Sequence, residues 1–156
     1  MTMTGVERLF VDTNVLIYAT NERSPWHQTA NARLQEARQL GIDLVISTQV
    51  LREYLAAATR TSDSGDGIPI TKILGNVETF QREMTVVEDT QRVVQALTVL
   101  LNTIVVAGKQ VHDANIVATM QVYGIRHLLT HNGEDFVRFA HLITVMPLEE
   151  PSTRAE

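Results

Sequence analysis

The chain has 156 residues, which is enough for one domain with a sizeable hydrophobic core. Apolar residues make up 44% and charged residues 20%, as in ordinary globular proteins, and the absence of cysteine excludes disulfide bonds and thiolate metal sites. The formal net charge of −5 argues against binding nucleic acid by bulk charge alone, so such a partner would require acids concentrated in one site and basic residues elsewhere.

Short apolar runs alternate with helical patterns along the whole chain. In order they predict strand 9–11, helix 14–19, helix 26–40, strand 44–46, helix 48–60, helix 71–80, strand 85–87, helix 90–106, helix 111–123, strand 127–129 and strand 142–145. Pro25 opens a helix, and Gly41, Gly108 and Gly124 close three of them. Strands alternating with helices indicate an α/β fold with a parallel sheet covered on both faces.

A single domain is expected over residues 1–146, followed by a frayed tail over 147–156. The Ser-, Asp- and Gly-rich segment 61–69 is predicted to be a mobile loop and not a domain boundary, because too little chain lies on either side. The longest apolar stretch, 93–107, is interrupted by polar residues and is shorter than the ~20 residues of a membrane span. Residues 1–8 lack the pattern of a signal peptide, so we expect a cytoplasmic protein without membrane association.

Asp12 directly follows the first predicted strand. A strand that ends on a carboxylate, with a helix behind it, points this group out at the carboxyl edge of a sheet, where ligands bind in open α/β folds. Because no helix dipole offers a simpler reason for an acid at a strand end, Asp12 is the strongest candidate for a site residue.

Two further acids lie among apolar helical neighbours. Asp113 shares a helix face with Ile116 and Met120, where a carboxylate is costly unless it is paired or bound to a metal. The simpler alternative is that Asp113 complements the helix dipole. Glu53 has a similar position, and pairing with a neighbouring arginine is its simpler alternative.

Polar residues also gather after the fourth predicted strand, at Thr130, Asn132 and Asp135. A turn followed by a helix cap is the alternative here, above all for Asn132. The four acids Asp12, Glu53, Asp113 and Asp135 are each expected at a strand end or in the first turns of a helix that follows a strand, positions that share one edge of a parallel sheet. Four carboxylates there would repel one another, and Mg²⁺ or Mn²⁺ would relieve the repulsion. A metal held in this way can activate water and stabilise the charge that develops on a phosphodiester.

Four segments in this order resemble PIN-domain ribonucleases, and most of all the VapC-type toxins of bacterial toxin–antitoxin pairs. The resemblance spans residues 9 to 145 and rests on Phe10 to Ala19, Ser47-x-x-Val50-x-x-Glu53, His112-Asp113-Ala114-x-Ile116-Val117-Ala118 and Leu129-Thr130-x-Asn132-x-x-Asp135-Phe136.

The resemblance implies a PIN-like fold, in which a five-stranded parallel sheet is sandwiched by helices. It implies Mg²⁺- or Mn²⁺-dependent hydrolysis of structured RNA such as tRNA or rRNA by an acidic quartet, with Asp12, Asp113 and Asp135 as metal ligands and Glu53 as the fourth catalytic acid. It further implies a homodimer that a small antitoxin silences by inserting a segment near the active site.

Two departures from the family pattern bear on the site. Asn132 stands where some members carry another acid, so Asp135 becomes more necessary, and Asn132 and Thr130 are expected to orient other groups through hydrogen bonds. Thr13 and Asn14 are expected to hold Asp12 or to bind a metal-bound water. The loop at residues 62–69 is somewhat long, and we interpret it as a tolerated insertion in preference to an RNA-facing loop.

Other residues and other functions remain open. Arg52 and Lys109 are the better candidates for phosphate contact because they lie close before site acids, whereas Trp26 and Tyr18 are expected in the core or at a dimer contact. The alternatives are a non-catalytic PIN-like binding module, a housekeeping PIN nuclease without an antitoxin, and a receiver-like phosphotransfer domain. Position 14 counts against a related phosphatase, because it is Asn where a second Asp is expected.

Overall fold

The computed structural model describes residues 2–62 and 67–149, and its centre is a parallel sheet. The strands are β1 (Arg8–Val11), β2 (Asp43–Ser47), β3 (Thr85–Val87), β4 (His127–Thr130) and β5 (Thr144–Pro147). They are ordered β3-β2-β1-β4-β5, and every neighbouring pair is parallel. The predicted α/β fold with a five-stranded parallel sheet is therefore confirmed.

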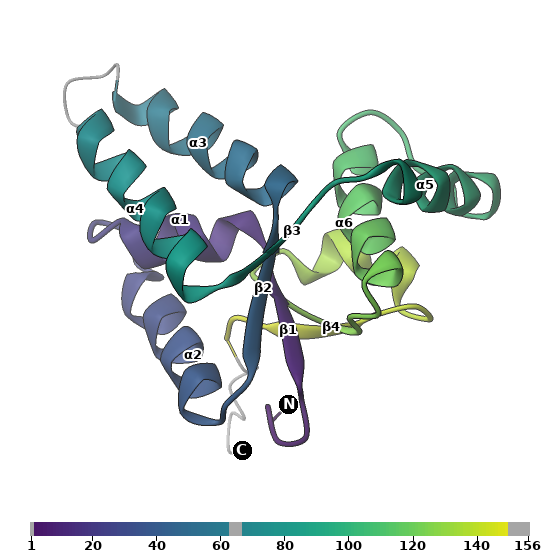
Figure 1. The fold of residues 1–156 in the computed structure, drawn as a ribbon, viewed down its shortest axis with the longest axis horizontal. Coiled ribbons are helices and arrows are strands. Elements are labelled where there is room, and N and C mark those ends of the chain that lie inside the picture. The colour runs from purple at the N-terminus through teal and green to yellow at the C-terminus, as the bar shows by residue number, and fades with distance from the viewer. Residues whose placement is uncertain (1, 63–66, 150–156) are drawn as a thin grey trace, which may run out of the picture.

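Seven helices are found in the described part of the chain, and they lie on both sides of the strands. They are α1 (Thr13–Thr20), α2 (His27–Gln39), α3 (Thr48–Ser62), α4 (Ile70–Glu83), α5 (Gln91–Thr103), α6 (Gln110–Val122) and the 3₁₀ helix η1 (Gly133–Phe139). Figure 1 shows α1 to α4 gathered on one side of β1 and β2, with α5 and α6 on the other.

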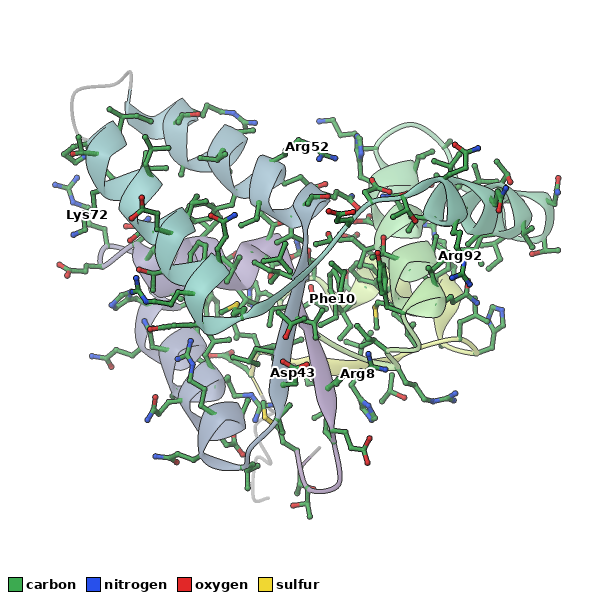
Figure 2. The ribbon with its side chains drawn as sticks, viewed as in Figure 1. Arg8, Phe10, Asp43, Arg52, Lys72 and Arg92 are labelled. Atoms are coloured by element: carbon green, nitrogen blue, oxygen red, sulfur yellow. The ribbon has the colours of Figure 1, made fainter. Side chains whose placement is uncertain are left out.

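Strand β1 forms the middle of the core. Its residues Leu9, Phe10 and Val11 are fully buried, because a central strand covered on both faces has no solvent side. Figure 2 shows Phe10 among the side chains at the centre of the molecule. Burial of such side chains contributes about 1.5–3 kcal/mol each. The next residue, Asp12, lies just beyond this apolar run at the carboxyl end of the strand.

Two glycines end helices so that the chain can turn directly into a strand. Gly41 follows α2 with a φ of +72°, and Gly124 follows α6 with a φ of +67°. In both cases the next residue donates its N–H to a carbonyl five positions earlier, Ile42 to Ala37 and Ile125 to Met120. These Schellman motifs favour glycine because an L side chain rarely adopts a positive φ. They set the starts of β2 and β4, and thus the positions at which those strands end.

Three predicted elements differ from the observed ones for local reasons. The predicted last strand lies two residues early, because Leu142 and Ile143 donate to Phe139 O and close η1 before β5 begins. The helix predicted to reach residue 106 ends at Thr103, where the β-branched run from Ile104 favours an extended backbone. No helix was predicted at η1, where a turn followed by a helix cap was only the alternative interpretation, and η1 buries Phe136 and Phe139.

The predicted loop and tail fall partly on residues that are not described. Helix α3 continues to Ser62, and residues 63–66 of the predicted loop lie outside the described residues. Of the predicted tail, Pro147 closes β5 and Leu148 is buried, whereas residues 150–156 lie outside the described part. Within residues 2–62 and 67–149, no helix is long and apolar enough to cross a membrane.

Candidate active site

The four predicted acids line one cleft, of about 330 Å³, at the carboxyl edge of the sheet. Each acid comes from a different element. Asp12 follows β1, Glu53 lies in α3 behind β2, Asp113 lies in the first turn of α6, and Asp135 lies in η1 behind β4. The other lining residues are Thr13, Asn14, Ile17, Tyr18, Ala57 and Asn132. The shared edge predicted from strand endings is thus where the chain places these carboxylates.

Asp12 is fixed by hydrogen bonds on both carboxylate oxygens. Thr13 N donates to Oδ1 at 2.8 Å, and Oδ2 accepts from Thr130 Oγ1 at 2.8 Å and from Asn14 Nδ2 at 3.2 Å. The backbone N–H of Asp12 continues the ladder to Leu129 O at 3.0 Å, which brings Thr130 beneath the carboxylate. Asp12 is also the N-cap of α1, so the helix end helps to stabilise it, contrary to the expectation from sequence.

The pKa of Asp12 is raised from 3.8 to about 6, chiefly because its carboxylate is withdrawn from water. Only 7% of the residue is exposed. The hydrogen bonds from Thr130 and Thr13 lower the pKa in part, while the charges of Glu53 and Asp135 raise it. The carboxylate therefore lies in an environment that favours neutralisation by a proton or by a cation.

Glu53 is held by donors from two helices. Thr13 Oγ1 donates to Oε2 at 2.9 Å, and Gln49 Nε2 donates to Oε1 at 3.0 Å. These donors replace the arginine pairing considered as its structural alternative. Arg52 lies instead 3.9 Å from Asp89, with 66% of its side chain exposed.

Gln49 is a buried residue of the site that the sequence did not single out. Its Nε2 also donates to His112 O at 3.0 Å, which connects α3 to the start of α6 immediately before Asp113. Its Oε1 accepts from Asn115 Nδ2 at 2.7 Å. A glutamine in the first turn of a helix is an ordinary surface residue, and only its spacing of four residues before Glu53 could have suggested this role.

Asp113 is less buried than Asp12, yet its pKa is also raised to about 6. Partial burial is the largest cause, followed by repulsion from Asp12, Asp135 and Glu53. No hydrogen bond from the described residues reaches the carboxylate of Asp113 or of Asp135. The helix dipole alone therefore does not account for Asp113, whose strongest interactions with charged groups are with other acids.

The turn after β4 is shaped by the polar residues predicted to orient the site. Thr130 Oγ1 donates to Asp12 and accepts the N–H of Asn132 at 3.1 Å, and Asn14 Oδ1 accepts the N–H of His131 at 3.1 Å. The carbonyl of Asn132 accepts the N–H of Asp135 at 3.0 Å. Thr130 and Asn14 thus act through their side chains, whereas the hydrogen bonds of Asn132 to the described residues are made by its backbone.

The donor chemistry of the cleft suits a hard divalent cation. Carboxylate oxygens are the protein ligands that Mg²⁺ and Mn²⁺ prefer. In the described residues no three His, Asp or Glu side chains converge closely enough to form a ready-made cage for an ion. The four acids are near enough to repel one another, but no three of them are grouped as direct ligands of one ion. Mg²⁺ characteristically uses one or two carboxylates and retains several waters, so the residues present fit such an ion.

A PIN domain family model matches residues 9–142, which is most of the chain. The chain belongs to the PIN domain family. No curated protein matched this PIN domain in sequence.

Solved structures of VapC toxins and toxin–antitoxin complexes share the fold of this PIN domain. Mycobacterium tuberculosis VapC20, described as a sarcin–ricin loop cleaving toxin, is 19% identical with a TM-score of 0.68 over 89% of this chain and 99% of that chain. VapBC2 from Rickettsia felis, bound to a promoter DNA fragment, is 17% identical with a TM-score of 0.66 over 90% and 98%. FitAcB from Neisseria gonorrhoeae is 14% identical with a TM-score of 0.61 over 90% and 97%.

Proposed function

We propose that this PIN domain is a metal-dependent endoribonuclease that hydrolyses phosphodiester bonds of structured RNA and acts as the toxin of a type II toxin–antitoxin system. The observation that carries the proposal is the convergence of four acids from four elements on one cleft. Two of these acids, Asp12 and Asp113, have a pKa raised to about 6 by burial and by the charges of the other acids. Such a cleft is electrostatically suited to a divalent cation.

Asp12, Asp113 and Asp135 would hold Mg²⁺ or Mn²⁺. When bound, the ion lowers the pKa of a coordinated water and stabilises negative charge on the phosphate oxygens. Asp12 is the natural anchor because Thr13, Asn14 and Thr130 already fix both of its oxygens. These three residues set the orientation of the carboxylate, as outer hydrogen-bond partners commonly do at metal sites.

Glu53 is assigned a different role, because each of its oxygens already accepts one hydrogen bond from the protein. A carboxylate oxygen can accept more than one hydrogen bond, so Glu53 can still accept one from the attacking water. It thereby orients this water toward the phosphorus and receives its proton as the phosphodiester bond breaks. Gln49 and Thr13 keep Glu53 in place for this task.

The proposed substrate class and partners rest on analogy with solved structures that share the fold. VapC20 is described as cleaving the sarcin–ricin loop, and a structure from Klebsiella pneumoniae is described as a toxin–antitoxin complex. We infer by analogy that this chain acts on tRNA or rRNA, forms a homodimer and is silenced by a small antitoxin. Such a substrate would place its activity in the cytoplasm.

The proposal is tested by expressing the full chain in a bacterial host and mapping the new RNA ends, with Asp12→Asn as the matched inactive control. We expect arrest of growth and discrete ends in a tRNA or rRNA with the native chain, and neither with Asp12→Asn. Co-expression of a small protein encoded next to the gene should relieve the arrest.

The remaining outcomes separate the alternatives. Discrete RNA ends without growth arrest would reject the toxin assignment and support a housekeeping nuclease. A folded protein that binds RNA but leaves no new ends, in the host or in vitro with Mg²⁺ or Mn²⁺, would reject catalysis and support a binding module.

A further inference from the structure

Three aromatic side chains form a continuous cluster that begins inside the acidic cleft. Tyr18 lines the cleft directly. Its ring meets the ring of His131 edge-on, with centroids 5.4 Å apart and planes at 84°. His131 in turn packs on Trp26, with centroids 4.4 Å apart and planes at 46°. We call Tyr18, His131 and Trp26 the aromatic cluster.

The aromatic cluster is assembled from three separate segments and is held in place by the backbone. Tyr18 lies in α1, Trp26 immediately precedes α2, and His131 follows β4. The carbonyl of Tyr18 is hydrogen-bonded to His27 Nδ1 at 2.9 Å, and the N–H of His131 donates to Asn14 Oδ1 at 3.1 Å. All three side chains remain partly exposed to solvent, unlike the fully buried core aromatics Phe10 and Phe136. Tyr18 and Trp26 pack against the hydrophobic core on one side, so the cluster forms a partly exposed aromatic surface at the border of the core, beside the acids.

An acidic protein with an acidic cleft needs a source of affinity for RNA that does not depend on positive charge. The net charge is −5, and the cleft carries four acids. A cation bound by those acids could draw one phosphate close, but it would not hold the neighbouring nucleotides. Stacking of a base on an aromatic ring supplies affinity that does not depend on the charge of the protein, because every base has a π-face.

We propose that the aromatic cluster is a nucleobase-binding subsite, on which an unpaired base next to the scissile phosphate stacks. Ile17 and Ala57 also line the cleft and add apolar surface to it. One wall of the cleft then receives a base while the acids face the phosphate. The subsite selects RNA in which a base is unstacked from its neighbours, as in a loop or bulge of a folded RNA. This inference rests on the proposed ribonuclease function and deepens it.

Trp26 provides a direct optical signal for the subsite, because it is the only tryptophan in the chain. The experiment titrates the full-length protein with a short single-stranded RNA in excess chelator, which prevents cleavage, and follows Trp26 fluorescence. The matched probe has the same sugar–phosphate backbone but carries abasic residues. We expect the RNA to change the fluorescence and the abasic chain to leave it unchanged at equal concentration.

Substitutions at Tyr18 separate stacking from simple packing. Tyr18→Leu removes the ring but keeps an apolar side chain, and Tyr18→Phe keeps the ring as the matched control. We expect Tyr18→Leu to weaken RNA binding about tenfold and Tyr18→Phe to change it by less than about twofold. In cleavage assays with Mn²⁺, Tyr18→Leu should raise KM and leave kcat nearly unchanged, because it removes binding energy common to the ground and transition states.

The outcomes distinguish this inference from the function on which it rests. If RNA is cleaved but neither Trp26 fluorescence nor the RNA affinity of Tyr18→Leu changes, the subsite is overturned while the ribonuclease stands. A lower unfolding temperature of Tyr18→Leu with unaltered RNA affinity would likewise assign the cluster to packing alone. Absence of both cleavage and RNA binding in the native protein would overturn the two proposals together.

Discussion

The two sides of the acidic cleft carry the same chemical group but are built differently. On the β1 side, Asp12 is buried and accepts hydrogen bonds from three neighbouring residues. On the side formed by α6 and η1, no described residue donates a hydrogen bond to the carboxylate of Asp113 or Asp135. One side therefore has a carboxylate of fixed orientation, and the other has carboxylates whose orientation is not set by a hydrogen bond from the described residues.

The difference teaches how a site can be suited to an ion without forming a closed cage. Mg²⁺ requires near-ideal octahedral geometry and gives up its waters reluctantly. A fixed Asp12 defines where the ion lies, while Asp113 and Asp135 retain the freedom to meet it directly or through water. Their mutual repulsion disfavours the metal-free cleft, so an ion gains affinity by relieving it.

The largest effect is expected from loss of the fixed carboxylate. Asp12→Asn should lower RNA cleavage by about three orders of magnitude or more, as is typical when a catalytic carboxylate is removed. Asp43→Asn is the matched control, because Asp43 lies at the amino end of β2, remote from the cleft (Figure 2). Cleavage rates in Mn²⁺ measure both. Equal rates for the two variants would contradict the placement of the site.

Lengthening the acids tests the contrast between the two sides directly. Asp12→Glu should lower cleavage about a hundredfold, because a shift of roughly 1 Å at a fixed group is costly. Asp113→Glu should lose less than about tenfold, since its carboxylate can readjust. Rates and unfolding temperatures of both variants give the comparison. The reverse order of sensitivity would show that α6 holds the fixed ligand.

Gln49 donates a hydrogen bond to Glu53, and its replacement should have an effect of intermediate size. Gln49→Leu removes the donor to Glu53 and leaves the carbonyl of His112 without that partner. We expect a ten- to hundredfold loss in kcat, the usual range for a residue that orients a catalytic group. The increase in unfolding temperature caused by Mn²⁺ should persist, because the proposed ligands are intact. If kcat is unchanged in a folded variant, Gln49 does not position Glu53.

The raised pKa of Asp12 predicts how stability depends on pH without metal. A carboxylate whose pKa is about 6 when folded and 3.8 when unfolded binds a proton more readily in the folded state, so it favours folding at low pH. As pH rises from about 4 to 7, ionisation of Asp12 should lower the free energy of unfolding by about 2–3 kcal/mol. Urea unfolding of the native protein and of Asp12→Asn, repeated in chelator across this pH range, gives the free energy of unfolding of each at every pH. The difference between the two isolates this loss. The same dependence of stability on pH in both proteins would contradict the raised pKa.

The smallest effect is expected at Arg52, beside the cleft but outside both sides. Its pair with Asp89 is long, at 3.9 Å, and 66% of its side chain is exposed. Figure 2 shows Arg52 on the outer surface of α3. Arg52→Ala should change the free energy of unfolding by less than about 0.5 kcal/mol. A large loss of RNA affinity in this variant, measured at low salt, would instead assign Arg52 to phosphate contact.

Strand endings, and the starts of helices that follow strands, were sufficient to predict the sheet and the grouping of three of the four acids. Parallel strands bring their carboxyl ends together whatever the order of the strands, so the grouping of Asp12, Glu53 and Asp135 required no knowledge of register. Asp113 lies in α6, which follows α5 and not a strand, so its place at this edge depends on how α6 packs. Their catalytic and metal-binding roles stay predictions.

The contacts that depend on tertiary packing could not be predicted. Gln49 looks like an ordinary helical residue until α6 is packed against α3. Tyr18 and Trp26 pack against the core, as one of the two expectations had it, but their ring contacts with His131 depend on the turn after β4. The start of β5 was misplaced because the apolar residues Leu142 and Ile143 complete η1 first. Local patterns thus fix which elements form, whereas side-chain partners depend on how those elements pack.

RNA cleavage by the purified protein with and without divalent cations tests the central claim most directly. The full-length protein, freed of metal, is mixed with a structured RNA in chelator and then supplied with Mg²⁺ or Mn²⁺ in excess. The account predicts no cleavage until the ion is added, and none at any stage with Asp12→Asn. Undiminished cleavage by the native protein in excess chelator would contradict it.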